Sequence, residues 1–227
     1  QNGECPVTSR LIRGRLLSFK DVPRDIDDTS SYSYEEDGAV LTTDGVIIAS
    51  GDYARVKQQA PAEAIAIDHR PHLMMPGFID THLHFPQMQV IGSYAAALLE
   101  WLNTYTFVEE QKFVDPVHAA RIATAFFDEL VRHGTTSAVA YCSVHKSSAE
   151  AFFSESHRRN FRMIAGKVMM DRNAPPALLD TPQSGYDDTK AIIEEWHGKG
   201  RQMVAITPRF AITSSPEQLD MAGALMR

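Results

Sequence analysis

Two histidines one residue apart, His82 and His84, carry the chemistry that is most easily read from this sequence. Apolar residues precede them from position 73 on, which indicates a strand that emerges at the pair. Because side chains at i and i+2 lie on the same face of a strand, both imidazoles can point at one ion. Imidazole is a good zinc ligand, and two histidines leave room for ligands from later strands. The alternative is a pair of hydrogen-bonded core histidines.

The residues before this pair have the pattern of short β-strands. Apolar or alternating runs cover 11–19, 39–50 and 64–67. Within the second run, Asp44-Gly45 is typical of a hairpin turn, because glycine tolerates the positive φ that such turns need. The segment 21–37 is rich in Asp and Ser and is expected to be a solvated loop. We predict a small β-sandwich (composite) domain over residues 1–75.

From residue 78 on, strands alternate with helices. The expected strands are 78–82, 135–141, 161–169 and 203–208. Asp115 followed by Pro116 is a typical helix start, and Gly134 ends that helix. Ser147 and Ser215 each begin a capping-box pattern. Such an alternation predicts a parallel sheet with helices packed outside it.

Four strand–helix units fit into residues 76–227. A closed (β/α)₈ TIM barrel needs eight units and about 250 residues, and an open half barrel would leave two strand edges unpaired. The chain begins at Gln1 rather than Met and ends at Arg227 within a helical pattern. We therefore expect an α/β fold in which residues 76–227 are the first half of such a barrel, with the other half in a continuation.

Composition narrows the function classes. The chain has 227 residues, of which 44% are hydrophobic and 22% charged, as in ordinary globular proteins. Its net charge of −7 argues against a general nucleic-acid binder. Neither a run long enough to span a membrane nor a secretory signal is visible. Cys5 and Cys142 are too few for a disulfide scaffold, which favours a cytoplasmic location.

Longer motifs give the chain a resemblance to a known family. The segment from Pro76 to His84 resembles the first barrel strand of the amidohydrolase superfamily, the metal-dependent hydrolases. Within that superfamily, the segments 84–87, 99–107, 166–171 and 207–210 resemble guanine deaminases, in the expected order. The resemblance implies a zinc-dependent hydrolysis of guanine to xanthine and ammonia.

The resemblance also implies roles for individual residues. His82 and His84 match the first two zinc ligands. The positions expected to line the guanine pocket are His84, Phe85, Pro86, Gln87, Arg209 and Phe210. The Gln87 amide offers a donor and an acceptor, the Arg209 guanidinium offers donors, and the rings of Phe85 and Phe210 can flank a flat heterocycle. Gln87 could instead bind backbone, and Arg209 could pair with a carboxylate.

The remaining parts of the implied site have no match in this chain. The family's other metal ligands, its proton-shuttling Glu and its Asp are expected beyond residue 227, so we expect no complete catalysis from this chain alone. One zinc per subunit is expected, because the fourth strand carries no Lys that could bridge two metals. The resemblance further implies a homodimer. Alternatives are another aminated purine, a pterin or a triazine as substrate, or a catalytically silent scaffold.

Four other residues are less informative. Asp80 shares a strand face with His82 and is expected to be a structural partner. His145, after the second strand, is either at the mouth of the cavity or an ordinary loop residue. Lys167 is expected at the pocket edge or the surface, and Cys142 as a small buried hydrophobe.

Overall fold

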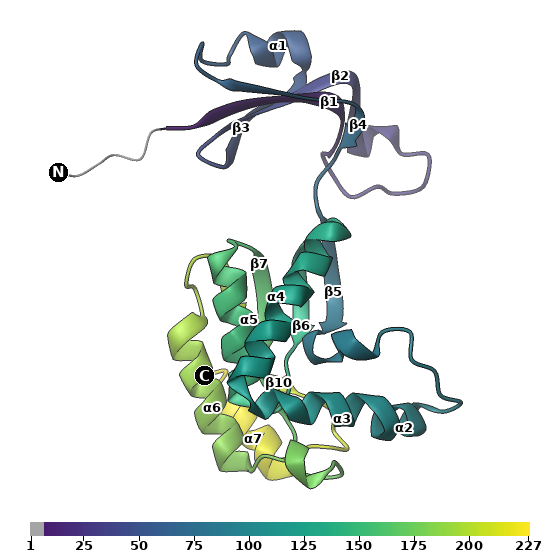
Figure 1. Ribbon diagram of the computed structural model, residues 1–227, viewed down its shortest axis with the longest axis vertical. Coiled ribbons are helices and arrows are strands. Elements are labelled where there is room, and N and C mark those ends of the chain that lie inside the picture. Colours follow the sequence, from purple (N-terminus) through teal and green to yellow (C-terminus); the bar gives the residue numbers. More distant parts are fainter. Residues whose placement is uncertain (1–6) are drawn as a thin grey trace, which may run out of the picture. The chain divides into compact units, whose positions relative to one another are not determined.

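The computed structural model describes residues 7–227, and Figure 1 shows their elements. The chain divides into two compact units between Pro76 and Gly77. This division lies one residue from the expected domain boundary. Each unit is described by itself below.

The first unit contains one mixed four-stranded sheet in the order β3-β2-β1-β4. Its elements are β1 (Ser9–Phe19), β2 (Tyr32–Thr43), β3 (Val46–Asp52), α1 (Tyr53–Lys57) and β4 (Ile65–Met74). β1 runs antiparallel to β2 and parallel to β4. Leu11, Ala39 and Leu41 of the sheet pack with Val56 of α1 in a small core. The predicted hairpin turn is confirmed, since Asp44 and Gly45 both have positive φ, 50° and 79°.

One expectation for this unit stays a prediction and another needs correction. Residues 7–76 form one sheet with α1 packed against it, so the predicted sandwich stays a prediction. The predicted loop over 21–37 is too long, because residues 32–37 belong to β2. Tyr32, Tyr34 and Asp37 pair across to β1, so tertiary pairing overrides the polar composition of this stretch.

The second unit is built on a parallel sheet in the order β5-β6-β7-β9. The strands are β5 (Phe78–His84), β6 (Thr135–Tyr141), β7 (Arg162–Gly166), β8 (Val168–Met169), β9 (Gln202–Val204) and β10 (Thr207–Pro208). The helices that follow them include α4 (Pro116–Arg132), α5 (Lys146–Arg158), α6 (Pro182–Trp196) and α7 (Pro216–Ala224). This arrangement confirms the four predicted strand–helix units. Among residues 7–227, no helix is long and apolar enough to cross a membrane.

A series of short helical segments lies between β5 and α4. They are η2 (Phe85–Val90), α2 (Leu98–Trp101), the π-helical η3 (Leu102–Thr106), α3 (Phe107–Glu110) and η4 (Gln111–Val114). η2 directly continues β5, so it carries the residues that follow the histidine pair. Figure 1 shows α2 and α3 lying crosswise to α4 and leading toward its start.

The third and fourth predicted strands are each broken in two. β7 and β9 continue the main sheet, whereas β8 and β10 pair with each other. Gly166 permits this break, because a Cβ at that position would lie 2.0 Å from the Ala205 carbonyl oxygen. The chain therefore turns its third and fourth strand ends away from the main ladder, which places Arg209 directly after β10.

Helix ends follow the sequence signals in part. Asp115 caps α4 by accepting from the Val117 backbone N–H, and Ser215 caps α7 by accepting from that of Gln218. The Ser147 capping box is wrong: α5 begins at Lys146, and the Ser147 hydroxyl donates to the Phe113 carbonyl. A contact 34 residues away therefore outcompetes the local cap.

The main core lies between the sheet and helices α4 and α5. It contains a cluster of aromatic side chains: Phe85, Phe113, Phe126, Phe127, Phe152, Phe153 and Trp196. β5 differs from the buried strand that the apolar approach predicts, because Phe78 and Ile79 are 56% and 71% exposed. The reason is its place at the edge of the sheet, where, among residues 7–227, it pairs with β6 alone.

Candidate active site

The two histidines lie close together at the end of β5. Their ring centroids are 5.3 Å apart. His84 pairs in register with Tyr141 of β6 and stacks on its ring at 4.9 Å with an interplanar angle of 12°. Asp80 accepts a hydrogen bond from the His82 backbone N–H at 3.0 Å, as expected of a structural partner. β5 and β6 therefore place two imidazoles and a phenol at one edge of the sheet.

The electrostatics at His84 favour its neutral form. Burial is the main cause, and the charges of Arg209 and His82 add to it, so the pKa of His84 falls to about 4. A neutral imidazole has a free nitrogen lone pair, which is the form that coordinates a metal. The site thus holds His84 ready to act as a ligand at neutral pH.

A buried carboxylate joins the predicted recognition residues. Glu110 accepts from Gln87 Nε2 at 2.9 Å and from Arg209 Nη1 at 2.7 Å. The side chains of Arg209 and Glu110 are only 5% and 2% exposed. The structure therefore brings Gln87 and Arg209 together, and the pairing of Arg209 with a carboxylate is the alternative that the sequence left open.

Sequence reasoning missed Glu110. It follows Glu109 in a short polar stretch that resembles an exposed helix face. Its partner Arg209 lies 99 residues later, so no local spacing connects the two. The only available signal was the arginine itself, because a buried guanidinium requires a carboxylate partner.

Phe85 corrects an expectation. Its side chain is fully buried and packs against Phe113, Phe126 and Phe152. The ring is therefore part of the core and does not line the cavity that opens nearby. Pro86 is buried as well, whereas Phe210 is 52% exposed beside Arg209.

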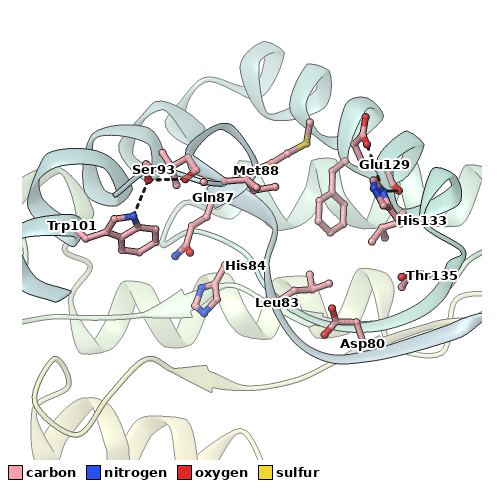
Figure 2. A pocket seen from close by; sticks show the side chains of 15 residues that line it. Asp80, Leu83, His84, Gln87, Met88, Ser93, Trp101, Glu129, His133 and Thr135 are labelled. Carbon is pink, nitrogen blue, oxygen red and sulfur yellow. Dashed lines mark hydrogen bonds and ion pairs between the residues drawn. The ribbon is translucent and has the colours of Figure 1, made fainter. Parts of the chain in front are cut away.

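A cavity of about 840 Å³ opens beside His84. Figure 2 shows His84 and Gln87 at one end, and at the other Glu129 of α4 and His133, which caps that helix. At the latter end, His133 Nδ1 bonds the Glu129 carbonyl oxygen of its own helix. Glu110 and Arg209 do not line this cavity, so it meets their cluster at Gln87.

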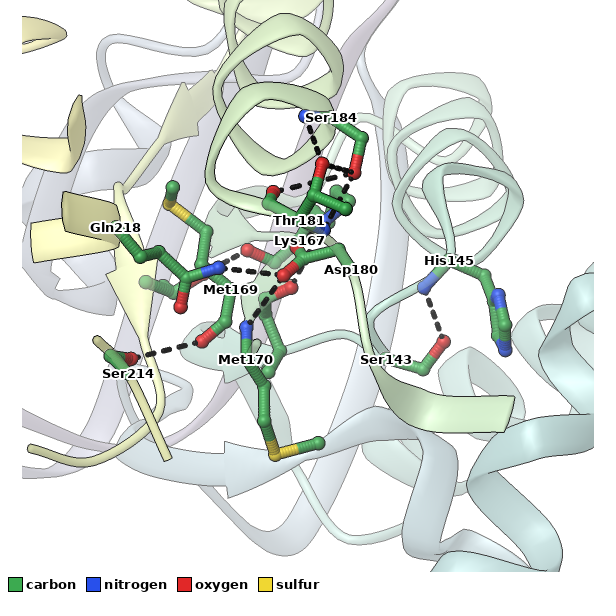
Figure 3. A network of polar contacts seen from close by, with 12 residues as sticks. Ser143, His145, Lys167, Met169, Met170, Asp180, Thr181, Ser184, Ser214 and Gln218 are labelled. Atoms are coloured by element: carbon green, nitrogen blue, oxygen red, sulfur yellow. Dashed lines mark hydrogen bonds and ion pairs between the residues drawn. The ribbon is translucent and has the colours of Figure 1, made fainter. Parts of the chain in front are cut away.

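Three other residues have clear environments. Lys167 is 1% exposed and pairs with Asp180 at 2.7 Å, so the expectation of a pocket-edge or surface lysine is wrong. Figure 3 shows this pair, with His145 on the neighbouring segment. Burial lowers the pKa of His145, with a smaller effect from Lys167. Cys142 is a buried free thiol, as predicted, and Cys5 lies outside the described residues.

The donor set fits part of a metal site. Within residues 7–227, no group of three or more His, Cys, Asp or Glu side chains is arranged to hold a metal ion. His82 and His84 supply two nitrogen donors, whereas a zinc site needs three or four protein ligands. The pair is chemically suited to zinc and requires further ligands.

Comparison with known proteins places the chain in a family. The model of the amidohydrolase family matches residues 73–227, which include the histidine pair and Arg209. The chain belongs to the amidohydrolase family. Its parallel sheet and following helices are then the strand–helix units of an amidohydrolase fold.

Individual relatives of this amidohydrolase are guanine deaminases. That of Escherichia coli is 46% identical over 222 residues, which cover 96% of this chain and 50% of the relative. The crystal structure of a guanine deaminase from Bradyrhizobium japonicum aligns with a TM-score of 0.91 at 39% identity, covering 96% of this chain and 47% of that one. A guanine deaminase from C. acetobutylicum with guanine in its active site aligns with a TM-score of 0.82 at 28% identity, covering 96% and 50%. The chain spans about half the length of the relatives it matches.

Proposed function

We propose that this amidohydrolase chain supplies two zinc ligands and the purine-recognition residues of a guanine deaminase. The observation that carries the proposal is the proximity of a neutral His84, beside His82, to the Gln87–Glu110–Arg209 cluster. Metal dependence is typical of the amidohydrolase family. Guanine as the substrate is supported by the guanine deaminases among the relatives.

The reaction is a hydrolytic substitution at the amino-bearing carbon of guanine. Water adds its oxygen to that carbon, the carbon–nitrogen bond breaks, and ammonia leaves with xanthine as the other product. Zinc, when bound, supplies Lewis-acid activation of water. His82 and His84 would hold the ion as neutral nitrogen donors. The further ligands and the proton-shuttling Glu would come from the part of the protein beyond residue 227.

The role of the remaining residues is to bind and orient the purine. Guanidinium N–H groups of Arg209 donate to the ring carbonyl, and the Gln87 amide forms a hydrogen bond with the adjacent ring edge. Phe210 is exposed enough to cover one face of the heterocycle, and Phe85 supports the neighbouring residues from the core. Desolvated polar groups of this kind reject purines that cannot pair with them.

The resemblance to guanine deaminases supports two further parts of the proposal. They are a single zinc per subunit and a homodimer. The scarcity of cysteines favours the reducing cytoplasm as its location.

The direct test is ammonia release from guanine by the complete gene product, with zinc supplied. We expect release that chelation abolishes and that added zinc restores. The same assay on adenine, a pterin and an amino-triazine separates the alternatives. Release from one of these but not from guanine would show that this heterocycle, rather than guanine, is the substrate. Stoichiometric zinc without release from any of them would refute the substrate assignment, and neither zinc nor release would indicate a silent scaffold.

A further inference from the structure

The carboxylate of Glu110 lies where three distant segments of the second unit meet. Glu110 ends α3, Gln87 is in η2, and Arg209 follows β10. The Glu110 side chain is 2% exposed, and each of its oxygens has one partner: Oε1 accepts from Gln87 and Oε2 from Arg209. A buried carboxylate that is shared in this way fixes both partners at once.

This arrangement determines which way the Gln87 amide faces. A carboxylate only accepts hydrogen bonds, so the Gln87 amide must turn its NH₂ group toward Glu110. The carbonyl oxygen Oε1 is then directed elsewhere, and among residues 7–227 no donor bonds it. Since Gln87 lines the cavity beside His84, its carbonyl is available to a ligand as an acceptor.

Arg209 is held equally firmly. Its backbone N–H donates to the Met169 carbonyl at 3.1 Å, and its guanidinium carbon lies 5.5 Å from the centroid of the Phe107 ring. One Nη1 donor is used by Glu110. The other guanidinium N–H groups have no hydrogen-bond partner within the described residues. Arg209 does not line the cavity, so these donors remain for a ligand that extends past Gln87 to the guanidinium.

We infer that Glu110 is a positioning residue that selects a lactam edge, a ring carbonyl next to a ring N–H. With Glu110 in place, Arg209 presents donors to the carbonyl while Gln87 presents an acceptor to the N–H. Guanine and hypoxanthine have this edge, and unsubstituted purine has neither a carbonyl nor an N–H on its six-membered ring. The inference rests on the proposed function, because it assigns the origin of the specificity of that same site.

The test compares two unreactive ligands in the zinc-loaded complete gene product. Hypoxanthine keeps the lactam edge, and purine lacks it. In E110Q the new amide can donate to Gln87 Oε1, so the Gln87 amide turns round and its acceptor is lost. We expect the Kd of hypoxanthine, measured by calorimetry, to rise about 10- to 100-fold, as for a buried ring N–H that is left without an acceptor. The affinity for purine should stay at its wild-type value.

E109Q is the matched control, since the same change is made on the same helix. Glu109 pairs with Lys112 rather than with the recognition residues, so E109Q should bind hypoxanthine as the wild type does. If E110Q fails to fold, Q87M provides the second test, because Gln87 is only partly buried and methionine lacks the acceptor. Q87M should also weaken hypoxanthine binding while leaving purine binding unchanged.

The outcomes separate this inference from the proposed function. Wild-type affinity for hypoxanthine in a folded E110Q, or equal losses for hypoxanthine and purine, would overturn the positioning role while guanine deamination persists. In Q87M, unchanged affinity for hypoxanthine, or equal losses for hypoxanthine and purine, would likewise overturn the positioning role. Absence of ammonia release from guanine by the wild type would instead refute the proposed function, and the specificity assigned to Glu110 would fall with it.

Discussion

Lys167 and Asp180 form a buried ion pair in which every charged atom has a hydrogen-bond partner. Lys167 Nζ donates to Asp180 Oδ2 at 2.7 Å and to the Val168 carbonyl at 3.2 Å. The other carboxylate oxygen accepts from the Met170 backbone N–H and from Gln218 Nε2 (Figure 3). Lys167 and Met170 flank β8, and Gln218 belongs to α7. The pair therefore links the segment of β7 and β8 to α7. We interpret it as a structural connection.

Replacing Lys167 should be costly. K167M leaves the carboxylate of Asp180 buried without a counter-ion, so we expect the free energy of unfolding to fall by about 3–5 kcal/mol. K112M removes a partly exposed ion pair with Glu109 and should cost less than about 1 kcal/mol. Urea unfolding of both variants measures the difference. Equal losses would contradict the structural role of the buried pair.

Cys142 should be unreactive in the folded protein. Its side chain is 2% exposed, and burial raises the pKa of its thiol well above the usual range. In a C5S background, we expect a thiol-specific reagent to label Cys142 only after a denaturant is added. The measurement is the rate of labelling with and without urea. Fast labelling in native buffer would show that the end of β6 opens readily.

At this scale, local spacing was predictable from the sequence and long-range pairing was not. The His82-x-His84 pair is visible because the period of a strand puts both rings on one face. Glu110 is invisible because its partner Arg209 is 99 residues away. The side chain of Phe85 was assigned to the ligand, yet its neighbours in space, Phe126 and Phe152, bury it in the core.

At the scale of elements, α4 and α5 are tied together by a charge network. Glu155 of α5 accepts from Arg158 and Arg159, and Arg159 also pairs with Asp128 of α4. Hydrogen bonds from Arg158, and then from Arg159, lower the pKa of Glu155 below its ordinary value. A carboxyl with a lowered folded-state pKa stabilises the fold above its unfolded pKa, and this stabilisation is lost as the pH falls through the folded pKa.

This network predicts a pH dependence of stability. Because the pKa of Glu155 is lowered, its contribution should be complete at neutral pH and should decline below about pH 4.3, the usual glutamate pKa. E155Q should therefore be less stable than the wild type at neutral pH. On acidification, it should lose less of its stability than the wild type does. The measurement is the melting temperature from pH 7 down to pH 3. An unchanged profile in E155Q would contradict the assignment.

Element positions were predictable where a local signal determines the backbone. The turn at Asp44-Gly45 and the start of α4 after Asp115 follow directly from φ preferences and capping. The Ser147 cap failed because its hydroxyl bonds a distant carbonyl. The exposure of β5 could not be predicted either, because an apolar run does not indicate whether both faces of its strand are covered.

For the whole molecule, the chain, with its first unit and its four strand–helix units, spans about half the length of its guanine deaminase relatives. The described residues of the second unit present His82, His84 and the recognition cluster, but no group of three metal donors. The family match and the parallel sheet were predictable from motif order and alternation. The sandwich expected for the first unit stays a prediction, because short strands alone do not reveal how many layers they form.

The chain produced by itself should therefore be inactive. We expect no ammonia from guanine when residues 1–227 are assayed alone with zinc, because two imidazoles do not complete a tetrahedral site. The complete gene product serves as the positive control in the same assay. Zinc-dependent release by the 227-residue chain would show that its own residues complete the site.

The central claim is that His82 and His84 hold the metal on which guanine deamination depends. The most direct measurement is the rate of xanthine formation from guanine by the zinc-loaded complete gene product and by its H82A variant. H69A, which removes an exposed histidine of β4, is the control and should retain the wild-type rate. We predict that H82A loses activity together with its zinc. Full activity in folded H82A would contradict the account.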